Sequence, residues 1–186
     1  MLEAACCQIS AWAKDPATAL LTVAVNVSAR QFRQADFVEQ VLAALDRASA
    51  DPNKLKLEIT ESMLVDNLEE TIEIMMRLKK HGVQFSMDDF GTGYSSLAYL
   101  KRLPLDQLKI DRAFIRDMLS NLASDAIVQA IVSLSQAMHL SLLAEGVETE
   151  QQRARLNDLG CHAYQGYLFS PPVPADRFPS LLEATR

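Results

Sequence analysis

Acidic and amide side chains recur at the ends of short apolar runs along this 186-residue chain. In parallel α/β folds, the carboxyl ends of the strands carry the loops that build active sites. Any one such acid is as readily a helix N-cap or a solvated loop residue. Five strand ends with the same feature favour a site, because an isolated buried charge is costly. The residues in question are Asn26, Glu58, Asp88, Asp89, Asp111, Glu145 and Glu148, with Gln165 inside the last run.

Carboxylates that converge repel one another, so positive charge must lie among them. Lys109 alone does not neutralise the set. Oxygen ligands without His or Cys suit the hard cations Mg²⁺, Mn²⁺ and Ca²⁺. Two such ions about 3.5–4 Å apart are the usual machinery of phosphodiester hydrolysis. The residue types therefore predict a divalent-metal site that receives an anionic substrate.

The elements that must position these residues are short strands alternating with helical patterns, which is typical of repeated βα units. Several strand candidates are apolar on successive positions, as in parallel sheets covered on both faces. The chain opens with a helical pattern over Leu2–Ala13 and continues as one α/β domain of about six βα units. The six strand candidates are Leu21–Ser28, Leu55–Thr60, Val83–Phe90, Gln107–Asp111, Ser141–Gly146 and Ala163–Phe169.

Helix boundaries are also marked in the sequence. Asn67-x-x-Glu70 and Thr149-x-x-Gln152 resemble capping boxes, and Ser124 is the expected N-cap of a long helix. Gly82 and Gly160 are expected at helix C-termini.

Composition excludes several classes of protein. Hydrophobic residues make up 49% and charged residues 23%, which argues against disorder and against a fibrous protein. No apolar run approaches the roughly 20 residues that cross a bilayer. The start of the chain lacks a basic segment followed by an apolar one, so a cytoplasmic domain is expected. A net charge of −6 disfavours a binder of DNA or RNA polymers. The three cysteines and three histidines show no zinc-ligand spacing.

Six stretches, in this order, resemble the EAL family of cyclic-di-GMP phosphodiesterases over essentially the whole chain: NVSARQF, EITES, DDFGTGYSSL, LKID, AEGVET and QGYLFS. The resemblance implies a (β/α)₈ TIM-like barrel with one antiparallel strand. It also implies metal-dependent hydrolysis of cyclic di-GMP (c-di-GMP) to linear pGpG in bacterial second-messenger signalling, with Mg²⁺ or Mn²⁺ as cofactor. Ca²⁺ is expected to bind and inhibit.

Roles carry over by motif, as implications of the resemblance. By position in their motifs, Asn26, Glu58 and Asp88 resemble the family's ligands of the first metal. Asp88 would bridge to a second metal, held also by Asp89 and Asp111, and Glu145 is a further metal-site carboxylate. Lys109 resembles the lysine that orients the nucleophilic water, while Glu148 and Gln165 resemble groups that position ligands or water. Glu61 resembles the glutamate that holds the mobile loop carrying Thr92, Tyr94 and Ser95.

The chain departs from the family pattern at its front. The Glu-x-Leu signature that names the family does not occur before Asn26, and about six βα units are expected where a barrel has eight. We therefore expect residues 1–186 to form a single EAL-like domain that is truncated at its N-terminus. The alternatives are a catalytically impaired c-di-GMP-binding or protein-interaction module, or a fragment completed by another chain. The resemblance further implies a homodimer and an upstream sensor or GGDEF domain in a longer parent protein. The absence of a long apolar run predicts no membrane partner within this chain.

Overall fold

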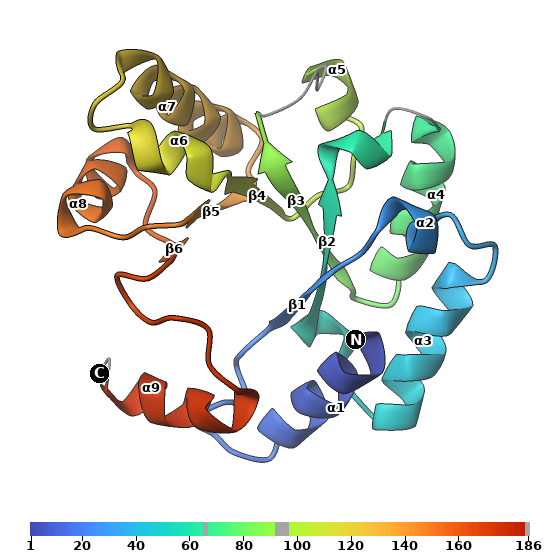
Figure 1. Ribbon diagram of the computed structural model, residues 1–186. Coiled ribbons are helices and arrows are strands. Elements are labelled where there is room, and N and C mark those ends of the chain that lie inside the picture. Colours follow the sequence, from blue (N-terminus) through green and yellow to red (C-terminus); the bar gives the residue numbers. More distant parts are fainter. Residues whose placement is uncertain (65–66, 92–96, 185–186) are drawn as a thin grey trace. The chain divides into compact units, whose positions relative to one another are not determined.

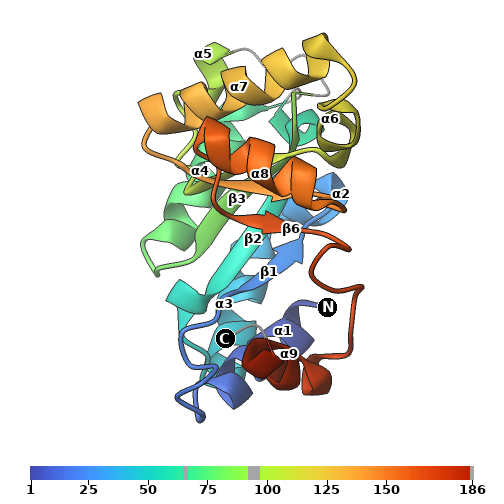
Figure 2. The same cartoon turned by 90° about the vertical axis from the view of Figure 1, so that its left-hand side faces the viewer.

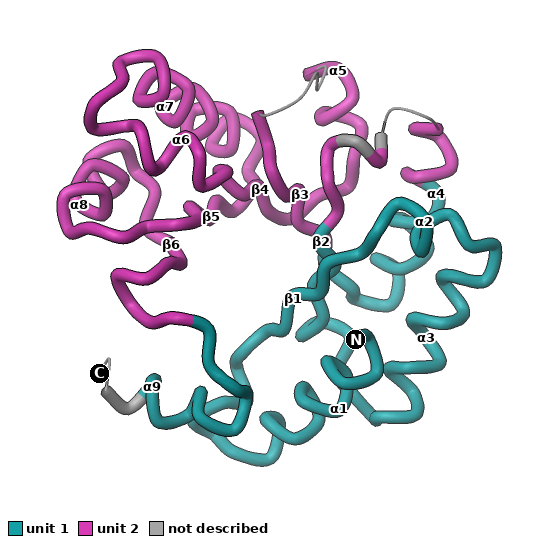
Figure 3. Tube along the Cα trace, in the orientation of Figure 1, with its two compact units in different colours: residues 1–58, 73–84, 172–186 teal, residues 59–72, 85–171 magenta. Residues whose placement is uncertain are grey.

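The structure is a computed structural model that describes residues 1–64, 67–91 and 97–184 (Figure 1). The chain divides into two compact units (Figure 3). Unit 1 comprises residues 1–58, 73–84 and 172–186, and unit 2 comprises residues 59–72 and 85–171.

Within the described ranges, strands and helices alternate along the chain. The strands are β1 (Val23–Asn26), β2 (Leu55–Thr60), β3 (Gln84–Phe90), β4 (Gln107–Ile110), β5 (Ser141–Glu145) and β6 (Tyr164–Gln165). The α-helices are α1 (Leu2–Trp12), α2 (Ala29–Phe32), α3 (Phe37–Ala48), α4 (Leu68–Lys79), α5 (Leu97–Leu100), α6 (Arg112–Asp117), α7 (Leu122–Ala137), α8 (Glu150–Leu159) and α9 (Phe178–Ala184). Short 3₁₀ turns are η1 (Pro52–Lys54), η2 (Glu61–Leu64) and η3 (Ala175–Arg177).

In unit 1, β1 pairs in parallel with β2, and helix α1 packs against both α3 and β1. Cys6 and Ile9 of α1 are buried, as are Val41 and Leu45 of α3. An ion pair of 2.6 Å between Glu3 and Arg47 joins the same two helices at the surface. The apolar face of the opening helix therefore forms part of the core of unit 1.

In unit 2, β3, β4, β5 and β6 pair in chain order, and every pairing is parallel. Helix α7 packs on β4 and β5, and α6 packs on α7 and β5. Figure 2 shows α8 beside α7, where Arg155 holds Asp125 through two hydrogen bonds of 2.8 and 2.7 Å. The hydrogen bonds to Arg155 are the main reason that the pKa of Asp125 lies below its usual range.

The predicted α/β pattern is confirmed, with two strands much shorter than expected. The first predicted strand, Leu21–Ser28, forms only over β1 (Val23–Asn26). The β2 bounds coincide with the prediction, whereas β6 covers two residues of the predicted Ala163–Phe169. Strand pairing stops there because the chain turns after Gly166, where Phe169 N–H donates to the Gly166 carbonyl at 3.1 Å. In the part of the chain that is described, no helix is long and apolar enough to span a bilayer.

The helix caps follow the sequence signals with one exception. Thr149 and Gln152 form the predicted capping box of α8, which ends at Gly160 with φ +93°. Helix α7 is capped by Asn121, whose side chain accepts from Ala123 N–H at 2.9 Å, so the Ser124 prediction was wrong. Because Asn121 caps the helix, α7 begins three residues earlier than the prediction placed it. Ser124 lies buried within the first turn.

Candidate active site

A buried lysine connects three strands at the centre of unit 2. The Lys109 ammonium on β4 lies 3.0 Å from an Asp88 oxygen on β3 and 2.6 Å from Glu145 Oε1 on β5. The Lys109 side chain is 4% exposed, and the two carboxylates are 14% and 17% exposed. Gln165 on β6 donates to the same Glu145 oxygen at 2.9 Å. Four predicted site residues are thus joined by direct contacts.

A bulge near the end of β3 explains how two consecutive acids serve one site. In a regular strand, successive side chains point to opposite faces. Here the register with β4 shifts between Met87 and Phe90, and Asp89 has φ +54°. The Asp88 side chain reaches Lys109, while Asp89 shares a hydrogen bond with Asp111. The bulge therefore turns both carboxylates toward the end of β4.

The carboxylates of this region crowd one another. Burial raises the pKa of Asp89, as do the neighbouring Asp88 carboxylate and then the hydrogen bond and charge of Asp111. Asp111 is also the N-cap of α6, where its side chain accepts from Ala113 N–H at 2.8 Å. A pocket of about 630 Å³ lies against these groups, lined by Asp89, Asp111, Arg112, Ala113, Arg116 and Glu145.

Two glycines set the spacing of the loops that follow β5 and β6. Gly146 has φ +69°, and a Cβ placed there would lie 2.6 Å from the Arg112 Cβ. At Gly166, a Cβ would lie 2.2 Å from the Val147 carbonyl oxygen. The absence of side chains lets the loop after Glu145 lie directly between the start of α6 and the end of β6.

Gln152 is a positioning residue that the sequence identified only as a helix cap. Its buried amide oxygen accepts from Glu148 N–H at 2.8 Å and from Thr149 N–H at 3.0 Å. Its amide nitrogen donates to the Ile115 carbonyl on α6 at 3.1 Å. The loop that carries Glu148 is therefore tied to the helix that Asp111 caps. The capping-box pattern indicated Gln152, but the bond to Ile115 depends on tertiary packing.

Replacing Gln152 with alanine should lower the free energy of unfolding by about 2–3 kcal/mol, because three backbone partners, of which the Ile115 carbonyl is buried, lose their hydrogen bonds. Gln151→Ala is the matched control, since Gln151 is exposed in the same helical turn. Urea denaturation of both variants measures the difference. Equal stabilities would show that water replaces the Gln152 amide at no cost.

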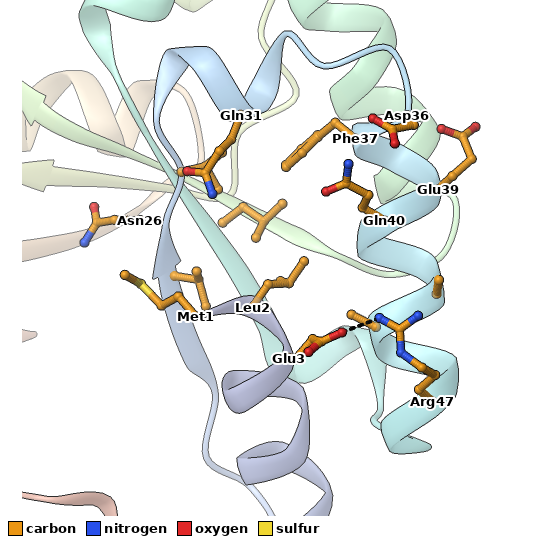
Figure 4. A pocket seen from close by; sticks show the side chains of 15 residues that line it. Met1, Leu2, Glu3, Asn26, Gln31, Asp36, Phe37, Glu39, Gln40 and Arg47 are labelled. Carbon is orange, nitrogen blue, oxygen red and sulfur yellow. Dashed lines mark hydrogen bonds and ion pairs between the residues drawn. The ribbon is translucent and has the colours of Figure 1, made fainter.

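Two of the predicted ligands lie in unit 1. Asn26 ends β1 and is the register partner of Glu58 on β2. Asn26 is exposed, whereas Glu58 is 7% exposed. Asn26 stands at the edge of a pocket of about 560 Å³, which Leu2, Phe37 and Gln40 also line (Figure 4). The two oxygen donors of unit 1 are thus side by side, as parallel pairing predicts.

Glu61 begins the turn η2 in unit 2 and is 7% exposed. Among the described residues, neither of its carboxylate oxygens has a hydrogen-bond partner. Thr92, Tyr94 and Ser95, which the resemblance assigns to the loop held by this glutamate, lie outside the described residues. The loop-holding role of Glu61 remains a prediction.

The chemical type of the donor atoms in unit 2 suits a hard cation. Asp88, Asp89 and Asp111 offer only carboxylate oxygens. Burial and, after it, the nearby Asp88 and Asp111 carboxylates raise the pKa of Asp89. In the described ranges, no three Asp, Glu, His or Cys side chains are arranged to hold one ion. The Lys109 ammonium instead stands between Asp88 and Glu145. The metal site predicted for Asn26, Glu58 and Asp88 stays a prediction.

Comparison with known proteins decides the family. The family model described as EAL domain matches residues 1–172. The chain belongs to the EAL domain family. It is similar to the cyclic di-GMP phosphodiesterase NbdA of Pseudomonas aeruginosa, with 48% identity over 89% of the chain and 21% of that protein. This EAL chain thus spans about a fifth of the length of that relative.

Solved EAL structures share the fold. The PaMucR phosphodiesterase, solved as a c-di-GMP complex, has a TM-score of 0.91 at 46% identity, over 95% of this chain and 71% of that one. The EAL domain of Mycobacterium smegmatis DcpA has a TM-score of 0.92 at 39% identity, over all of this chain and 83% of that one. The succession of parallel strands and helices is therefore part of a TIM-like barrel, as the sequence predicted.

Proposed function

We propose that this EAL chain hydrolyses c-di-GMP to linear pGpG with the help of divalent metal ions. Water attacks one phosphorus atom, and the bond from that phosphorus to a ribose 3′ oxygen breaks. The product carries a 5′-phosphate and a free 3′-hydroxyl. The names of NbdA and of the PaMucR complex support the substrate. The acidic strand ends support the use of metal.

The observation that carries the proposal is the buried contact of Lys109 with Asp88 and Glu145. A lysine held by two carboxylates is fixed in one position, next to the crowded pair Asp89 and Asp111. In this proposal Lys109 orients the attacking water. Gln165 holds Glu145 in place, and Glu148 is fixed through its backbone N–H by Gln152.

Metal ions would be held by the oxygen donors that the resemblance assigns, namely Asn26, Glu58, Asp88, Asp89 and Asp111. When bound, Mg²⁺ or Mn²⁺ polarises the phosphate and lowers the pKa of a coordinated water. A homodimer and an upstream sensor or GGDEF domain in a longer parent protein remain predictions from the resemblance.

The test is a hydrolysis assay on c-di-GMP that follows pGpG by chromatography. We expect product with Mg²⁺ or Mn²⁺, and none with EDTA or Ca²⁺. Asp111→Asn should lower the rate about 10²-fold or more, by analogy with the loss of one electrostatic group at an active site. Asp158→Asn, an acid that is not in the site, is the control. Binding of c-di-GMP without any product would replace this proposal with a binding module.

A further inference from the structure

Two arginines line the pocket beside the acidic strand ends, and neither belongs to the residues assigned so far. Arg112 and Arg116 lie one helical turn apart on α6, so their side chains leave the same face of that helix. They share the pocket of about 630 Å³ with Asp89, Asp111 and Glu145. The pocket therefore has both carboxylate and guanidinium groups in its lining.

Arg112 is placed by the backbone of the neighbouring loop. A Cβ on Gly146 would lie 2.6 Å from the Arg112 Cβ, so the first atoms of the Arg112 side chain pack directly on the residue after Glu145. Arg112 also follows the helix cap Asp111 without a gap. In the described part of the chain, no hydrogen bond or ion pair engages its guanidinium group. Its positive charge is therefore not committed to another described residue.

Arg116 stands farther along the same face. Its Nε contacts Asp117 at 2.9 Å, and that side-chain hydrogen bond is the main cause that raises its pKa. The charges of Asp111 and Glu148 act in the same direction, so Arg116 lies within electrostatic reach of both. The Arg116 side chain is 73% exposed and is accessible to a ligand in the pocket.

We propose that Arg112 and Arg116 form a phosphate-binding subsite that holds the phosphodiester of the dinucleotide that is not cut. This inference rests on the proposed function, because a cyclic dinucleotide carries two phosphates and only one reacts at a time. The reacting phosphate belongs with the carboxylates. The other brings a second negative charge, which those carboxylates would repel. A guanidinium group matches two phosphate oxygens at once, and pockets of a few hundred cubic ångströms are typical of small-ligand sites.

The test is calorimetric titration with c-di-GMP in Ca²⁺, where hydrolysis is not expected. Arg112→Ala should raise the Kd about tenfold, and Arg112→Ala with Arg116→Ala about 50-fold, as for the loss of charge-assisted hydrogen bonds. The Kd of Arg112→Lys should lie between that of the unmodified chain and that of Arg112→Ala, because a lysine keeps the charge but not the paired donors. The control is Arg153→Ala on α8, whose arginine has a local ion pair with Glu150 at 2.7 Å. Circular dichroism verifies that each variant is folded.

A second measurement separates the subsite from the proposed function. Inorganic phosphate is titrated in metal-free buffer and followed by phosphorus NMR, with the reference chain and the double variant. Phosphate binding that the double variant loses, in a chain that does not bind c-di-GMP, would show that the two arginines bind phosphate but would overturn the dinucleotide as its source, and with it the proposed function. Equal affinity of all variants for c-di-GMP would overturn the subsite alone. Binding of neither ligand to the reference chain would overturn both.

Discussion

Lys109→Met should abolish c-di-GMP hydrolysis and, in metal-free buffer, lower the free energy of unfolding by about 3–5 kcal/mol. Lys109 is 3% exposed, and its ammonium separates Asp88 from Glu145. Removing it leaves two largely buried carboxylates without their cation, which costs more than the loss of one surface ion pair. The rate should fall at least about 10²–10³-fold, as when a preorganised charged donor is removed from an active site.

The double variant Lys109→Met, Asp88→Asn separates stability from catalysis. It removes one carboxylate together with the lysine, so most of the lost stability should return while hydrolysis stays absent. Lys101→Met is the control, because Lys101 is exposed in the same unit. Urea denaturation and product formation are measured on all four proteins. If Lys109→Met had the same stability and the same hydrolysis rate as the unmodified chain, Lys109 would have neither the stabilising nor the catalytic role.

Gly166→Ala should be the most destabilising single methyl addition at the site, with a loss of more than about 3 kcal/mol. Its Cβ would lie 2.2 Å from Val147 O and 2.4 Å from Val147 N. Both are backbone atoms held in hydrogen bonds, since Val147 N–H donates to Gln165 O and Val147 O accepts from Leu168 N–H, each at 3.0 Å. Neither the Val147 backbone nor the backbone around Gly166 can move apart without breaking these two hydrogen bonds.

The same substitution should impair the chemistry. A shift of β6 would move Gln165 away from Glu145, which it contacts at 2.9 Å, and a misplacement of about 1 Å can cost roughly 10²-fold in rate. Gly160→Ala is the matched control: its φ is also positive, at +93°, but the nearest atom is the flexible end of Gln136 at 3.0 Å. That control should lose only about 1 kcal/mol. Chemical denaturation that finds both variants equally stable would disprove the close-packing argument.

Local signals predicted most of the elements because they depend on neighbours in the chain. The run Leu55–Thr60 forms a strand with the predicted bounds, and its alternate apolar residues Leu55, Leu57 and Ile59 are fully buried. The capping box at Thr149 and the glycine at position 160 define both ends of α8. The same reasoning failed at Ser124, because Asn121, an equally suitable cap residue three positions earlier, caps α7 instead.

The sequence by itself determined which acidic and amide side chains stand at the ends of the strands, because the alternating βα pattern marks where each strand ends. It did not determine how they pair. The bulge that turns Asp89 beside Asp88, the contact of Lys109 with Glu145 and the approach of Val147 to Gly166 each join strands that are distant in sequence. Arg112 follows Asp111 in the chain, yet only the close approach of Gly146 places it over the site. Such contacts depend on register and backbone separation between strands, which tertiary packing decides.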